Sequence, residues 1–220
     1  MNQLAELCKA MIAYDKGDPR RIHHFLKVNA FAHQIGLEEG ASDKILFLLD
    51  AVTYVHDIGI HEGERRFGRN DGMIQQELGP DEARPMLENL QFEKEDIDRI
   101  CWLIAHHHSY GSIDGPDAQI LAEADMLVNQ YESGASRQQN EALYKRLYKT
   151  EAGKRLFREL YFETYDPGDK TNARYVARLT GRTGRKDPPW TQEKGHGFWQ
   201  VEWLWRKDRG GRNDARVRSP

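Results

Sequence analysis

The sequence predicts an all-α protein: a helical bundle over residues 1–165, followed by an irregular basic extension over residues 166–220. The first observation is the spacing of apolar residues. In several segments of the first part they recur at three- and four-residue steps, as on the buried face of an amphipathic helix. The second observation is a change of composition, because glycine and proline interrupt the second part among many arginines and lysines.

Composition and charge restrict the class of protein. Hydrophobic residues make up 39% of the 220 residues, which suffices for a core. The two cysteines, Cys8 and Cys101, are far apart and do not indicate a disulfide framework or a zinc ribbon. The sequence shows no signal peptide, and no apolar run approaches the roughly 18 residues of a membrane span. These features predict a cytoplasmic protein without a membrane partner.

The net charge of −3 conceals an asymmetry. Residues 171–220 hold 12 Lys and Arg against 5 Asp and Glu, whereas residues 1–170 hold 20 against 30. An acidic body is not typical of a nucleic-acid-binding domain. In the extension, four tryptophans lie among the basic residues. This pattern fits stacking on single-stranded nucleic acid, or packing against the domain or a partner subunit. Packing is favoured, because stacking platforms normally lie on a folded sheet, and it leaves a homo-oligomer open.

The first two predicted helices cover residues 4–12 and 19–36. Between them the sequence DKGDP interrupts the apolar pattern, and Asp18 is placed to cap the second helix with Pro19 at its first position. The second helix carries His24 near its start. A single histidine at such a place is more often a surface or packed residue, so the spacing alone gives His24 no role.

The segment ILFLLDAVTYVHDIGIH, residues 45–61, begins as a helix and ends in polar residues. His56 lies four residues after Val52 and therefore continues the buried apolar face. Asp57 follows at once, and Gly59 offers a place for the helix to end. A buried aspartate is unfavourable unless it is paired or bound to a metal. The pair therefore indicates a cation nearby.

Residues 62–72 show no apolar periodicity and are predicted to form a loop. Since this loop follows the His-Asp pair directly, its arginines, Arg65, Arg66 and Arg69, can present guanidinium groups to an anionic substrate. A solvated surface loop is an equal alternative, because loops generally lie on the surface and are polar.

Further helices are predicted over residues 75–90, 93–108, 117–128 and 138–162, with Pro80 or Pro85 marking a joint in the first of them. The inner residues expected in the last of them are Leu143, Leu147, Leu156 and Leu160. The second ends in three consecutive histidines, of which His107 and His108 extend the buried face. In the third, Asp125 lies four residues after Leu121 within an apolar run. This is again an unfavourable place for an unpaired carboxylate.

Together these polar residues resemble the signature of the HD superfamily of metal-dependent phosphohydrolases. His24, the run His56-Asp57-Ile58-Gly59 and Asp125 stand in the order and helical setting of that family, and the resemblance covers residues 20–129. It implies that one metal ion is bound by His24, His56, Asp57 and Asp125. It also implies that Asp57 helps to activate water, and that His107, His108, Lys27 or the three arginines stabilise a phosphate. The expected partner is a small phosphorylated substrate, with a nucleotide as one option.

The expected cofactor is one divalent first-row ion. Two imidazoles and two carboxylates suit Mn, Fe, Co, Ni or Zn, and suit Mg less well. Dinuclear members of the superfamily, including oxygenases, place a further histidine where this sequence has Gln75, so a single metal is predicted. A di-iron oxygenase and a catalytically silent metal- or nucleotide-binding module are the alternatives that the sequence leaves open.

Overall fold

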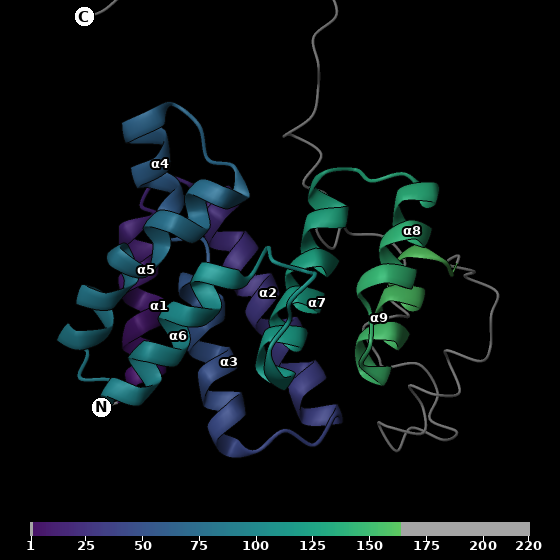
Figure 1. Cartoon of the computed structure of the whole chain (residues 1–220), viewed down its shortest axis with the longest axis horizontal. Helices are drawn as coiled ribbons and strands as arrows, with labels where there is room; N and C mark the ends of the chain where they lie inside the picture. The colour runs from purple at the N-terminus through teal and green to yellow at the C-terminus, as the bar shows by residue number, and fades with distance from the viewer. Residues whose placement is uncertain (1, 164–220) are drawn as a thin grey trace, which may run out of the picture. The chain divides into compact units, whose positions relative to one another are not determined.

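The computed structural model describes residues 2–163, and within them the chain forms nine α-helices and no β-strand. In chain order (Figure 1) the helices are α1 Gln3–Tyr14, α2 Pro19–Glu38, α3 Asp43–Val55, α4 Gly59–Phe67, α5 Gly72–Asn89, α6 Lys94–His106, α7 Gly115–Glu132, α8 Arg137–Leu147 and α9 Glu151–Tyr161. The prediction of an all-α domain is confirmed. The predicted extension, residues 166–220, lies outside the described residues.

Helix α3 is the central element, and α1, α2, α6 and α7 all pack against it. Its inner residues Leu49, Ala51, Val52 and Val55 have no exposed surface. Ser42 caps its first turn by accepting a hydrogen bond from the Ile45 backbone N–H at 3.3 Å. Full burial of a leucine or valine stabilises a fold by about 1.5–3 kcal/mol. The C-terminal end of α3, where the His-Asp pair follows, is therefore held firmly in the core.

Helices α2 and α7 pack along each other, and α5 and α6 form a second closely packed pair. Helices α8 and α9 lie on the side of α7 that faces away from α5 and α6 (Figure 1). As predicted, α2 begins at Pro19, and the Asp18 side chain accepts a hydrogen bond from the Arg21 backbone N–H at 3.1 Å. None of the described helices combines the length and the apolar character that a membrane span requires.

The prediction of a loop over residues 62–72 is wrong, because most of that segment belongs to α4. Glu62 accepts hydrogen bonds from the arginines three and four residues later, and such pairs support an exposed helix that lacks an apolar stripe. Gly59 begins this helix. Since α4 packs closely on α5, a Cβ atom at Gly59 would lie 2.8 Å from the Gly79 backbone nitrogen.

Two further expectations are corrected. Helix α5 continues through Pro80 and Pro85 without a joint, because each proline removes only one backbone hydrogen bond and the packing of α5 on α6 supports the rest. Leu160, expected on the inner face of residues 138–162, is exposed. Leu143 and Leu147 of the same segment are buried as expected.

Candidate metal centre

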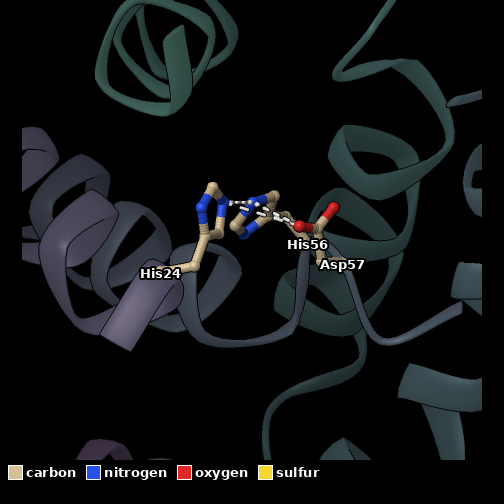
Figure 2. Close-up of side chains that lie close together, drawn as sticks. All are labelled: His24, His56 and Asp57. Atoms are coloured by element: carbon tan, nitrogen blue, oxygen red, sulfur yellow. Dashed lines mark hydrogen bonds and ion pairs between the residues drawn. The ribbon is translucent and has the colours of Figure 1, made fainter. Parts of the chain in front are cut away.

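Three helices bring the four predicted metal ligands to one point. His24 lies on α2, His56 follows the last residue of α3, Asp57 lies in the turn before α4, and Asp125 lies on α7. Figure 2 shows the two imidazole rings with Asp57 beside them. The His24 Nε2 and His56 Nε2 atoms are 3.3 Å apart. Asp57 Oδ2 lies 3.5 Å from each of these nitrogens.

Asp125, on α7, is the fourth member of this group. Its Oδ1 atom lies 3.2 Å from His24 Nε2 and 3.6 Å from His56 Nε2. Asn129, one turn later on α7, donates a hydrogen bond to the same oxygen at 2.8 Å. The other oxygen, Oδ2, is buried and has no hydrogen-bond partner among the described residues. Burial of a carboxylate oxygen without a partner is unfavourable, so a cation or a hydrogen-bond donor is expected beside it.

The outer nitrogens of both rings are already hydrogen-bonded. His56 Nδ1 donates to the Thr53 carbonyl at 2.9 Å, and His24 Nδ1 donates to Glu132 Oε2 at 3.2 Å. In the neutral rings, the lone pairs of both Nε2 atoms therefore point at each other and at the two carboxylates. Such a set of convergent acceptors fits a metal cation, and the outer hydrogen bonds are of the kind that orient metal-binding histidines.

The electrostatic field in the centre favours positive charge. Burial acts to lower the pKa of His56, but the neighbouring Asp57 and Asp125 outweigh it and raise this pKa to about 9. Burial acts to raise the pKa of Asp125, and hydrogen bonds and charge from His24 and His56 instead hold it well below its ordinary value. Both carboxylates are thus negative at neutral pH, which suits a divalent ion.

A second group of potential ligands adjoins the first through Asp57. Asp57, His107 and His108 each offer a ligand atom within 4.8 Å of the others. His107 Nδ1 donates to the Ile104 carbonyl at 2.7 Å. Its Nε2 atom is buried without a hydrogen-bond partner among the described residues and lies 3.5 Å from Asp57 Oδ1.

His108 is engaged differently, through Gln75. The Gln75 side-chain amide donates to the Asn70 carbonyl at 2.6 Å, so its Oε1 atom is the acceptor that faces His108 Nε2 at 2.8 Å. His108 therefore carries its proton on Nε2. Burial, with the neighbouring His107 as a second cause, lowers the pKa of His108 to about 4, which keeps the ring neutral. One of the two ring nitrogens of His108 is thus engaged in a hydrogen bond.

A cleft of about 380 Å³ opens beside the first group, and His24 and Asp57 are among its lining residues. This volume lies in the lower part of the range of small-molecule sites. The Asp57 side chain is 27% exposed, whereas those of Asp125 and His56 are 2% and 0% exposed. Asp57 is therefore the carboxylate of the centre that a molecule in the cleft can reach.

The predicted phosphate-binding residues do not line this cleft. Arg65 and Arg66 are exposed and paired with Glu62, and Arg69 is exposed and paired with Asp71. Arg65 and Arg66 turn away because they lie on the outer face of α4, whereas Arg69 lies beyond the end of that helix. Lys27 does not line the cleft either, because its Nζ atom lies 2.5 Å from Glu132 Oε1.

Among the lining residues that were not singled out from the sequence are Arg20, Arg21 and Glu132. Helical spacing contained a signal for each of them. The two arginines stand four and three residues before His24 on α2, and Glu132 stands seven residues after Asp125 on α7. A search for polar residues on the same helix faces as the proposed ligands would have found them.

Comparisons with known proteins identify a family and a similar structure. A family model described as HD domain matches residues 21–130, which is half of the chain. One similar solved structure is the crystal structure of a predicted HD superfamily hydrolase from an uncultured Thermotogales bacterium. The two chains share 19% identity with a TM-score of 0.54, and the match covers 83% of this chain and 94% of that one, which establishes a common fold. No curated protein matches the sequence.

Proposed function

Because this chain belongs to the HD-domain family, we propose that it is a metal-dependent phosphohydrolase that cleaves phosphomonoesters, nucleotides among them. The observation that carries the proposal is the convergence of His24, His56, Asp57 and Asp125 beside a cleft of small-molecule size. Hydrolysis breaks the bond between phosphorus and the ester oxygen, forms a bond from phosphorus to a water oxygen, and transfers a proton to the departing alcohol.

The donor set of two imidazoles and two carboxylates fits Mn, Fe, Co, Ni or Zn better than Mg. When bound, such an ion supplies a Lewis acid that polarises a phosphoryl oxygen and acidifies water. The remaining work falls to side chains. Asp57 directs Oδ2 at the two imidazoles and Oδ1 towards His107, so that Oδ1 can accept a proton from the attacking water. Arg20, which lines the cleft, can offset the charge of the phosphate.

A phosphatase panel tests the proposal. Protein freed of metal by a chelator is supplied with each candidate ion in turn and assayed for phosphate release from nucleotides and sugar phosphates. We expect first-row ions to restore hydrolysis and magnesium to restore it less well. Tight binding of these esters without product would instead identify a catalytically silent module.

A di-iron oxygenase is the second candidate, and the group Asp57, His107 and His108 is the observation that favours it. Against it stands the hydrogen bond between His108 and Gln75, which engages one of the two ring nitrogens of His108. We therefore expect elemental analysis of protein purified without a chelator to give about one metal equivalent per chain, because the mixed N/O group of four residues offers one complete site.

The variant Gln75→His places an imidazole against His108 and is expected to raise the content towards two equivalents. Gln76→His, one residue further along α5, is the matched control, because Gln76 donates instead to the Ala105 carbonyl at 2.7 Å. Two equivalents in the unchanged protein, together with turnover that depends on dioxygen, would contradict the single-metal proposal.

Glu132 and Lys27 are expected to act on the metal through His24. Glu132 accepts a hydrogen bond from His24 with its Oε2 atom. Its Oε1 atom forms an ion pair with Lys27. Loss of such an outer carboxylate typically weakens metal binding by about 10–100-fold. Glu132→Gln should therefore lower metal affinity, measured by competition with a chelating dye, by about 10-fold or more. An unchanged affinity would show that Glu132 does not orient His24. Glu141→Gln, on the exposed surface of α8, serves as the control.

A further inference from the structure

The cleft is lined by more carboxylates than cations. Its acidic residues are Asp15, Asp18, Asp57, Glu64 and Glu132, and its arginines are Arg20 and Arg21. Asp57 belongs to the metal centre, and Lys27 pairs with Glu132 from outside the cleft. Asp15, Asp18 and Glu64 remain, and only two guanidinium groups oppose them.

One of these two arginines, Arg21, already interacts with neighbouring side chains of the protein. Arg21 donates to Glu64 Oε1 at 2.6 Å and to His61 Nδ1 at 3.0 Å, and it lies 3.4 Å from Asp18 Oδ2. His61, thus fixed as an acceptor on Nδ1, donates from Nε2 to Asp15 Oδ1 at 2.7 Å. Asn70 also donates to Glu64 Oε1, at 2.8 Å.

This network links four parts of the chain: the end of α1, the start of α2, helix α4, and the segment between α4 and α5. Its residues, which we call the polar wall, are Asp15, Asp18, Arg21, His61, Glu64 and Asn70. Within the described residues, Asp15 Oδ2 and Glu64 Oε2 have no hydrogen-bond partner. The wall therefore presents acceptor oxygens to the cleft. Arg20 makes no ion pair with another described residue and is the cation left for a ligand.

We propose that the cleft takes monoesters with a single phosphate and an uncharged, hydroxyl-bearing organic group, and that it discriminates against the corresponding diphosphates and triphosphates. This inference rests on the proposed function. Hydroxyl groups donate to carboxylates, so a sugar or nucleoside group satisfies the acceptors of the wall. Additional phosphates would bring negative charge against Asp15, Asp18 and Glu64, and juxtaposed like charges oppose binding.

The test compares adenosine monophosphate, diphosphate and triphosphate, with phenyl phosphate as an ester that lacks hydroxyls. Free metal is held constant, because the longer phosphate chains bind metal ions themselves. We expect kcat/KM for the monophosphate to exceed that for the triphosphate by at least about tenfold, equivalent to about 1.4 kcal/mol. It should likewise exceed the value for phenyl phosphate. Equal or faster turnover of the triphosphate would overturn the proposal.

Glu64→Gln removes one wall charge and loosens the hold on Arg21. It should raise kcat/KM for the triphosphate relative to the monophosphate by about threefold or more, since a like charge is lost. Glu62→Gln removes the same charge from the same helix outside the cleft and should leave this ratio unchanged. A ratio that is the same in both variants would count against the role of the wall.

Calorimetry separates this proposal from the proposed function. If no ester is hydrolysed with any metal, the phosphohydrolase proposal fails. Binding of adenosine monophosphate and triphosphate to manganese-loaded protein then still tests the cleft. Tighter binding of the monophosphate supports the proposal, and tighter binding of the triphosphate overturns it.

Discussion

Asp57→Asn is expected to abolish hydrolysis and to weaken metal binding by more than about 100-fold, the upper range for loss of a residue that only supports a ligand. The change removes a negative donor that lies 3.5 Å from both imidazole nitrogens. It also replaces the carboxylate that faces His107 by an amide, which is not basic, and so removes the proposed proton acceptor. Asp57→Ala should have the same effect. Metal content after gel filtration and phosphate release measure the two losses.

A second carboxylate–histidine pair on the same helices provides the control. Asp50 of α3 accepts from His33 of α2 at 2.9 Å, away from the cleft. Asp50→Asn removes the same charge from the same helix and should keep both metal and activity. If Asp57→Asn retained full metal content and rate, the metal-hydrolase mechanism would be untenable.

Glu123→Ala is expected to destabilise the domain by about 3 kcal/mol or more, because it leaves buried donors without an acceptor. Glu123 has no exposed surface. It accepts hydrogen bonds from the Lys149 backbone N–H at 2.6 Å, from the Thr150 backbone N–H at 3.0 Å, and from the Thr150 hydroxyl. Gln119 donates to it at 2.7 Å. This carboxylate thus fastens the start of α9 to α7.

Urea unfolding followed by circular dichroism measures the loss. Glu151→Ala, at the start of α9, is the control, because Glu151 is exposed and pairs with Lys154 on the surface, so the midpoint should not move. Equal midpoints for the unchanged protein and Glu123→Ala would show that the Glu123 carboxylate does not hold α9 to α7.

Part of the centre was predictable, because polar residues on otherwise apolar helix faces can be recognised in the sequence. His56 and Asp125 each extend a buried stripe, and the structure places both in the interior beside His24 and Asp57. Periodicity within one helix was sufficient to find them. Whether they bind metal remains a prediction for the experiments above.

The roles of the surrounding charges were not predictable in the same way. Lys27 stands three residues after His24, yet its direction depends on Glu132 at the end of α7, 105 residues later. The segment with Arg65 and Arg66 has no apolar stripe, so a pattern search gives no helix there, although exposed ion pairs and contact with α5 support one. The direction of Lys27 and the helical structure around Arg65 and Arg66 both depend on contacts between helices. Residue spacing within a single helix carries no information about such contacts.

The near contact between Gly59 and Gly79 gives the run His56-Asp57-Ile58-Gly59 a second meaning. Its first two residues are the predicted metal ligands, and its last residue determines how closely α4 can pack on α5. A Cβ atom at Gly59 would lie 2.8 Å from the Gly79 backbone nitrogen and 3.0 Å from the Gln75 carbonyl oxygen, so glycine at this position lets the start of α4 approach α5 closely. Asp57, two residues before Gly59, and Gln75 of α5 both line the cleft. The spacing of two segments that line the cleft therefore depends on an uncharged feature, the missing Cβ atom of Gly59.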